Sequence, residues 1–245
     1  MRYGMRSINK GCEGRDVQEL QIRLSGFVGG VPDGDFGPGT ERQVMAFQRD
    51  VMAQSQPSGV ADMETLEALE SFAAQHPMNW QDLACPCGVC RGFGQGLAQG
   101  EYRAEQPHIE AYHQYEYAGI HRSLLWALRA IIHYHPQLDL TISSGYRCSV
   151  NNRQKGRTST NHHGKAIDIA THGSREQRMM QSDRLRDDIM HQCNAQLGWQ
   201  HGNKKSLEPA NIAPTWVHLD VRCFAPKFLG DEHFCRNPVE LDRPL

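Results

Sequence analysis

Side chains that can bind a metal ion gather in two short segments of this chain. The first segment carries His162 and Asp168, and the second carries His218 and Asp220 about fifty residues later. Two imidazoles and a carboxylate form a donor set suited to Zn²⁺, with one coordination position left open. Since the chain has 13 histidines, part of this clustering is expected by chance. The sequence predicts a zinc site at His162, Asp168 and His218, against the plainer interpretation that these are satisfied core or surface residues.

Both segments show the alternation of side-chain types that is typical of β-strands. Over residues 166–170, Asp168 shares one face with two alanines, while isoleucines occupy the other face. Over residues 217–221, His218 and Asp220 share one face and apolar side chains form the other. A turn at Gly164 would bring His162 beside Asp168. We therefore expect two strands with buried backs to hold the metal ligands rigidly.

A third segment, Ser144-Gly145-Tyr146-Arg147, follows residues 138–143, which are expected to form a strand. Apolar residues at helical spacing over residues 120–132 predict a helix before it that ends ahead of Pro136. The planar guanidinium of Arg147 offers a fork of N–H donors that fits a substrate carboxylate. The structural alternative is a strand-to-turn junction with an exposed arginine.

The three segments, in this order, resemble the zinc D-Ala-D-Ala carboxypeptidase and endolysin peptidase superfamily of the M15 type. Its usual pattern is Ser-Gly-Tyr-Arg, then Ser-x-His-x-x-Gly-x-Ala-x-Asp, then a late His-x-Asp or His-x-Glu strand. In this chain the position three residues before Gly164 is Asn161. We therefore expect a loop that is shorter by one residue, with His162 as the zinc ligand and His163 as the alternative.

The resemblance also implies how a substrate is held. Arg147, together with Tyr146 and Ser159, would orient an anionic stem peptide of bacterial peptidoglycan. The bonds cleaved in this superfamily are D-Ala-D-Ala ends or L-Ala-D-Glu bonds, and the sequence does not choose between them.

The group that accepts the proton during catalysis is not evident. Many members carry an acid three residues before the last histidine, and here that position is Thr215. The group must then come from elsewhere near the metal. We expect Glu208 first and His201 second, because both lie in the loop that enters the second ligand strand; the alternative is that Glu208 is a solvated loop acid. Asp220 shares a face with His218, where its expected use is to orient that imidazole.

Residues 1–75 are expected to form a small three-helix module, with Asp16 capping the first helix, a glycine-rich loop over residues 32–40, and residues 59–62 opening the last helix. The module resembles the peptidoglycan-binding domain with the pattern Gly-x-x-Val-x-x-Leu-Gln, Asp-Gly-x-Phe-Gly-x-x-Thr and Phe-Gln. Most matching residues are expected to determine the fold rather than to contact glycan or peptide. They are Gly14, Val17, Leu20, Gln21, Asp33, Gly34, Phe36, Gly37, Thr40, Phe47 and Gln48.

Residues 76–117 are expected to be a linker or long loop that packs on the peptidase domain, because they carry three cysteines, Trp80 and several tyrosines. Cys85, Cys87 and Cys90 could hold a second, structural zinc, but the sequence does not reveal a fourth ligand. Disulfides or free thiols are the alternatives. An even total of 8 cysteines would suit disulfides formed after export.

Composition argues against several classes of partner. A net charge of -2 without a basic block gives no sign of nucleic acid or of an anionic membrane as partner. No apolar run approaches the length of a transmembrane helix, and the first ten residues lack the hydrophobic stretch of a secretory signal. We therefore expect a monomer that is made in the cytoplasm and acts in the periplasm or cell wall after lysis or dedicated export. A secretion apparatus or an immunity protein is then a candidate partner.

The expected fold class is α+β: the wall-binding module, then a zinc peptidase domain over residues 118–245 with a mainly antiparallel sheet, flanking helices and a tail on the surface. The expected function is a zinc-dependent peptidoglycan peptidase, either an endolysin or an antibacterial effector. A wall-binding protein that keeps zinc but has lost catalysis is the alternative, because the acid is missing at Thr215. A phosphoester hydrolase is disfavoured, since no further cluster provides a second metal.

Overall fold

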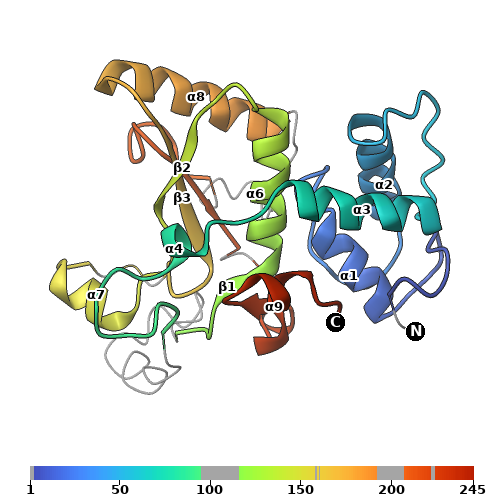
Figure 1. Cartoon of the computed structure of the whole chain (residues 1–245), viewed down its shortest axis with the longest axis horizontal. Coiled ribbons are helices and arrows are strands. Elements are labelled where there is room, and N and C mark those ends of the chain that lie inside the picture. Colours follow the sequence, from blue (N-terminus) through green and yellow to red (C-terminus); the bar gives the residue numbers. More distant parts are fainter. Residues whose placement is uncertain (1–2, 95–115, 158, 160, 192–206, 222–223) are drawn as a thin grey trace.

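The computed structural model describes residues 3–94, 116–157, 159, 161–191, 207–221 and 224–245 of the chain. Three helices, α1 (Arg15–Arg23), α2 (Pro38–Asp50) and α3 (Met63–Gln75), form the N-terminal part. A three-stranded antiparallel sheet with flanking helices forms most of the remainder (Figure 1). The expected α+β class is therefore confirmed. Among the described residues, none of the helices is long and apolar enough to span a membrane.

Two glutamines hold the loops that connect the N-terminal helices. The Gln21 side chain donates to the Asp33 carboxylate at 2.7 Å from within α1. The Gln48 side chain donates to the Thr65 hydroxyl at 3.0 Å and so ties α2 to the start of α3. Phe36 lies in the core with 1% of its surface exposed. These residues of the expected binding-domain pattern serve the fold, as predicted.

The predicted cap of the first helix is wrong. Helix α1 begins at Arg15 with Gly14 as its N-cap, so Asp16 lies inside the first turn. The Asp16 carboxylate instead accepts a hydrogen bond from Arg6 Nε at 2.7 Å. The last helix of the module, α3, begins after Asp62, as predicted. The Asp62 carboxylate caps this helix by accepting a hydrogen bond from the Thr65 N–H.

The sheet consists of β2 (Leu140–Ser144), β3 (Ala166–Thr171) and β4 (Val217–Asp220), with β3 in the middle. All residues of β3 are buried. Helix α6 (Arg122–Tyr134) ends ahead of Pro136, as the sequence predicted, and α8 (Arg175–His191) packs against β3 and β4. The short helix α7 (Ser149–Gln154) follows β2 and leads the chain toward the first metal-binding segment.

The C-terminal tail lies mostly at the surface, as the sequence suggested, but one of its residues anchors it in the core. Leu241 is fully buried, and its carbonyl accepts from Arg122 Nε at 3.0 Å. The tail lies between the N-terminal helices and the sheet domain (Figure 1). The remaining elements are α4 (Trp80–Leu83), β1 (Ile120–His121), which pairs with β5 (Phe234–Cys235), the 3-10 helices Pro226–Phe228 and Asp231–His233, and α9 (Pro238–Asp242).

The N-terminal helices share their core with helix α6. The Phe27 ring lies 5.5 Å from Phe72 of α3 and 5.8 Å from Tyr134 of α6, measured between ring centroids. Gly26 has no room for a side chain, because an added Cβ would clash with Ala130 of α6. The module is therefore docked on the sheet domain by close packing, in addition to its covalent connection.

A buried ionic cluster lies in the same interface. The Glu19 carboxylate of α1 binds Arg122 of α6 at 2.7 Å and Arg23 at 2.6 Å, and all three residues are at most 1% exposed. Arg23 also reaches the more exposed Glu70 at 2.8 Å. A buried charge cluster of this kind persists only where every charge has a partner.

Candidate functional site

The sheet places three polar side chains in one row. Ser144 of β2 lies opposite Asp168 of β3, and Asp168 lies opposite His218 of β4. Directly opposed residues of antiparallel strands direct their side chains to the same face. His218 Nδ1 is accordingly 2.7 Å from Asp168 Oδ1. Strand pairing alone therefore joins the two sequence segments that were expected to bind metal.

A tight turn brings His162 to the same face. Gly164 has φ of 109°, in the left-handed region that favours glycine, and an added Cβ would clash with the Gly119 carbonyl. His162 Nδ1 donates to the Gly145 carbonyl at 2.8 Å, so this nitrogen carries the hydrogen. The other nitrogen, Nε2, is left 3.3 Å from Asp168 Oδ1. The lone pair of His162 Nε2 is thus free to face a metal beside Asp168.

Asp220 holds the far side of the His218 ring. Its Oδ2 lies 2.9 Å from His218 Nε2, and the Asp220 side chain is fully buried. This is the geometry of an acceptor that orients an imidazole. Burial by itself lowers the pKa of His218, but the carboxylates of Asp168 and Asp220 outweigh it and raise the pKa to about 9. The carboxylates of Asp168 and Asp220 therefore favour the protonated, positively charged form of the His218 imidazole.

The environment of Asp168 strongly favours the ionised form of its carboxylate. Burial raises its pKa, whereas the neighbouring His162 and His218 rings outweigh burial and hold the pKa well below its usual range. Its second oxygen, Oδ2, accepts from Arg147 Nη2 at 2.7 Å. Oδ1 is thereby presented to the two imidazoles, as a single-oxygen metal ligand requires.

The donor atoms fit zinc. One ligand atom each from His162, Asp168 and His218 lies within 4.8 Å of the others. A tetrahedral Zn²⁺ with bonds of about 2.0–2.1 Å separates neighbouring ligand atoms by roughly 3.3 Å. The 3.3 Å between His162 and Asp168 matches this value, and the 2.7 Å between His218 and Asp168 would need to widen slightly. The three residues could therefore hold a metal ion and leave a fourth position open.

Arg147 is engaged inside the site. Besides its bond to Asp168, its Nε donates to Ser144 Oγ at 2.6 Å. Burial lowers the pKa of Arg147, against the attraction of Asp168 and, more weakly, of Glu208. A substrate carboxylate would have to bind the N–H groups that these two bonds leave on Nη1 and Nη2, and the substrate-binding role of Arg147 stays a prediction.

Glu208 lies beside the strand that carries His218. Leu207 forms an isolated antiparallel bridge with Leu219 of β4. Extended by one residue, the same register would set Glu208 opposite His218, on the face that carries Asp168. The attraction between Glu208 and Arg147 agrees with this placement.

A cleft of about 530 Å³ opens beside the cluster. Residues of the α4 segment and Trp216 line it, as do Arg147, Lys155 and Arg157 from the region around α7. Asp168 lies in its wall, so the candidate metal position opens into the cleft. The lining also includes the carboxylates of Asp82 and Asp168, so the three cations leave it with a small excess of positive charge, which favours an anionic ligand.

Two other residues expected at the substrate lie elsewhere. Tyr146 is fully buried, and its hydroxyl donates to the Tyr117 carbonyl at 2.6 Å, so its side chain supports the site from behind. Ser159 is exposed, and it is not among the described residues that line the cleft. Neither residue is among the described residues that line the cleft, so their contact with substrate stays a prediction.

The alternative ligand His163 is placed apart from the ligand group. His163 is buried, and its Nδ1 donates to the Arg147 carbonyl at 2.5 Å. It is absent from the group formed by His162, Asp168 and His218 within the described residues. His201 lies outside the described residues.

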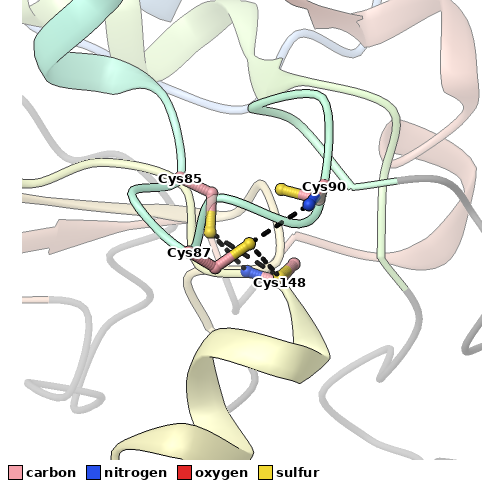
Figure 2. A group of neighbouring side chains, drawn as sticks. All are labelled: Cys85, Cys87, Cys90 and Cys148. Atoms are coloured by element: carbon pink, nitrogen blue, oxygen red, sulfur yellow. Dashed lines mark hydrogen bonds between the residues drawn. The ribbon is translucent and has the colours of Figure 1, made fainter.

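The structure adds a fourth cysteine to the group of three. Cys148, the N-cap of α7, lies beside Cys85, Cys87 and Cys90, and the four sulfur atoms are within 4.8 Å of one another (Figure 2). The described cysteines are free thiols rather than disulfides, while residues 193 and 223 lie outside the described ranges. This second group could also hold a metal ion.

Two family models match the chain. Residues 13–69 match the peptidoglycan binding domain, and residues 99–196 match Peptidase M15. The second match includes Arg147, His162 and Asp168 and ends before His218. No curated protein matches the chain. The domains and the donor cluster define a metallopeptidase that acts on peptidoglycan. More particularly, the chain joins an N-terminal peptidoglycan-binding domain to an M15 peptidase domain.

Proposed function

We propose that this chain is a zinc-dependent peptidase that cleaves the stem peptides of bacterial peptidoglycan. The observation that carries the proposal is the convergence of His162, Asp168 and His218 beside a cationic cleft. Zn²⁺, when bound there, supplies Lewis-acid activation of a water molecule and of the scissile carbonyl. The remaining chemistry belongs to the side chains around these ligands.

Glu208 is proposed as the general base. A peptidase needs one group that takes the proton from the attacking water and returns it to the leaving amine. The bridge between Leu207 and Leu219 supports this proposal, because the same register extended by one residue would set the Glu208 carboxylate opposite His218. Asp168 and Asp220 are already engaged as ligand and as acceptor for His218, so neither is available for this step. His201 is the second candidate.

The cleft is proposed to bind the acidic part of a stem peptide. Lys155 and Arg157 are exposed on its rim, and Arg147 lies at the point where the rim meets Asp168. Stem peptides carry carboxylates both at a D-Ala-D-Ala end and next to an L-Ala-D-Glu bond, and cations bind either. D,D-carboxypeptidase and L-Ala-D-Glu endopeptidase activities are therefore the two proposed forms of the reaction.

Residues 1–75 are proposed to anchor the enzyme on the wall, with residues 76–117 as the connection and residues 118–245 as the peptidase domain. The module has a cleft of about 340 Å³ of its own, lined by the loop between α1 and α2 together with Arg42 of α2. Binding of the wall there would raise the local concentration of stem peptides at the peptidase site.

Digestion of purified peptidoglycan tests the function. The protein is expected to change the muropeptide profile, and a zinc chelator is expected to abolish the change. Mass spectrometry of the new termini separates removal of a terminal D-Ala from a cut between L-Ala and D-Glu. A protein that binds the wall and zinc but leaves every peptide bond intact would instead be the catalytically impaired wall-binding protein.

Neighbouring histidines provide a matched test of the catalytic metal site. His162→Ala is expected to lose one equivalent of zinc relative to the unchanged chain, because its Nε2 faces Asp168. His163→Ala is expected to keep that equivalent, because its ring bonds the Arg147 carbonyl. Metal analysis of both purified variants decides, and zinc loss in His163→Ala alone would show that the assumed shorter loop is wrong.

A further inference from the structure

The four cysteines Cys85, Cys87, Cys90 and Cys148 have the spacing of ligands around one ion. Cys148 Sγ is 3.6 Å from Cys85 Sγ and 3.5 Å from Cys87 Sγ. A disulfide would bring two sulfur atoms to about 2.05 Å. A tetrahedral Zn²⁺ with Zn–S bonds of about 2.3 Å places its sulfur ligands roughly 3.8 Å apart. The observed separations therefore agree with a metal tetrahedron and not with a pair of disulfides.

Backbone N–H groups point at these sulfur atoms. Cys87 Sγ accepts from the Val89 N–H at 3.3 Å and from the Cys90 N–H at 3.2 Å, and Figure 2 shows the second of these bonds. Cys85 Sγ accepts from the Cys148 N–H at 3.4 Å, and Cys148 Sγ accepts from the Asn151 N–H at 3.4 Å. A neutral thiol is a weak acceptor, whereas a metal-bound thiolate is stabilised by such donors. Four donors aimed at three sulfurs favour the thiolate form.

The loop that carries three of the cysteines packs its sulfur-bearing side chains inward and exposes the residues between them. Its ends meet through a hydrogen bond from the Cys85 N–H to the Gly92 carbonyl at 2.6 Å. Gly88, with φ of 72°, makes the turn between Cys87 and Cys90. The side chains between the cysteines are exposed, with Val89 at 65%. A loop without a core of its own gains its order from a bound ion.

We propose that Cys85, Cys87, Cys90 and Cys148 bind one structural Zn²⁺, independent of the zinc at the peptidase site. Four thiolates complete the coordination shell, as in structural sites, and leave no position for a substrate. The sequence alone indicated three of these ligands. The fourth, Cys148, is the N-cap of α7 and is identified only by the structure.

This second zinc would connect the α4 side of the cleft to the segment that carries Arg147. Cys148 directly follows Arg147, and the α4 segment that precedes Cys85 contributes Ala84 to the lining of the cleft. The same two segments already join where the Tyr146 N–H donates to the Leu83 carbonyl at 2.8 Å. The ion would therefore fix the position of Arg147 relative to the α4 side of the cleft.

X-ray absorption at the zinc edge of the full-length His162→Ala variant tests this proposal directly. That variant lacks a ligand of the catalytic site, so the zinc that it retains reports on the cysteines alone. The expected result is one equivalent of zinc with four sulfur neighbours at about 2.3 Å. Zinc with nitrogen or oxygen neighbours, no retained zinc, or a coloured iron site would each overturn the assignment. Failure of the proposed peptidase activity would leave this readout unchanged.

Substitution provides the second arm. Cys148→Ser is expected to lower the zinc content of the otherwise unchanged chain from two equivalents to one. Cys12→Ser, at a free cysteine outside the cluster, is the matched control and is expected to keep both. If Cys148→Ser does not fold, titration of the thiols in the native, unchanged chain tests whether the four cysteines bind zinc. Four thiols protected until a strong chelator is added support the site, and four thiols that react freely overturn it.

Discussion

Glu208→Gln is expected to lower the rate of stem-peptide cleavage by on the order of 10²–10⁴-fold, the usual contribution of a general base. Glutamine keeps the size of the side chain but cannot take up a proton from the attacking water. Glu208 is proposed for this role because it directly follows Leu207, which forms a bridge with Leu219 next to His218. Initial rates of muropeptide conversion, measured beside zinc content and circular dichroism, should show lost turnover with unchanged zinc and fold.

An acid of the same type away from the cleft provides the control. Glu176 is exposed at the start of α8, and Glu176→Gln is expected to leave turnover unchanged. Near-normal turnover in Glu208→Gln would rule Glu208 out and make His201→Ala the next variant to measure.

The two strands that carry the ligands could be predicted because the alternation of polar and apolar residues that indicates each strand lies within a few consecutive residues. Alternation over residues 166–170 and 217–221 put Asp168, His218 and Asp220 on the correct faces, and antiparallel pairing then brought them together. His162 is harder, because its position depends on a turn. The left-handed conformation at Gly164 and the Gly145 carbonyl that orients the ring are properties of the folded chain.

Contacts between distant segments could not be read from the sequence. Cys148 lies about sixty residues beyond Cys90, and only the packing of the α4 segment against β2 brings them together. Arg147 was expected to be exposed or bound to substrate, yet the turn after β2, held by the bond from the Arg147 N–H to the His162 carbonyl, brings its side chain to Asp168. In each case the partner is chosen by strand register or tertiary packing, which no short pattern contains.

The docking of the two domains was missed for a related reason. Helical spacing predicted α1 and α6, but it did not indicate that polar residues of both helices face each other. Glu19 and Arg122 are about a hundred residues apart in sequence, and each would be expected on a solvated helix face. Their burial is visible only once the helices are packed.

Glu19→Gln is expected to destabilise the whole chain by about 3–5 kcal/mol, the usual cost of breaking a buried ion pair by removing one partner. The loss arises because Arg122 and Arg23 would keep their charges in a site that excludes water. Urea unfolding followed by circular dichroism would measure it as a lower midpoint. Since Glu19 joins the module to the sheet domain, the loss is expected in the unfolding of both.

Glu70→Gln is the matched control, because Glu70 also binds Arg23 but has 54% of its side chain exposed. An exposed pair contributes less than about 1 kcal/mol, so this variant should unfold at nearly the same urea concentration as the unchanged chain.

The pH dependence of stability provides a second test of Glu19. Burial raises the pKa of Glu19, but Arg122 and Arg23 outweigh it and lower the pKa below its value in the unfolded chain. Its contribution is then present above the unfolded pKa of about 4.3 and is lost as pH falls through the folded pKa. Glu19→Gln should remove that part of the acid destabilisation, and equal losses in the Glu19 and Glu70 variants would show that the cluster does not hold the domains together.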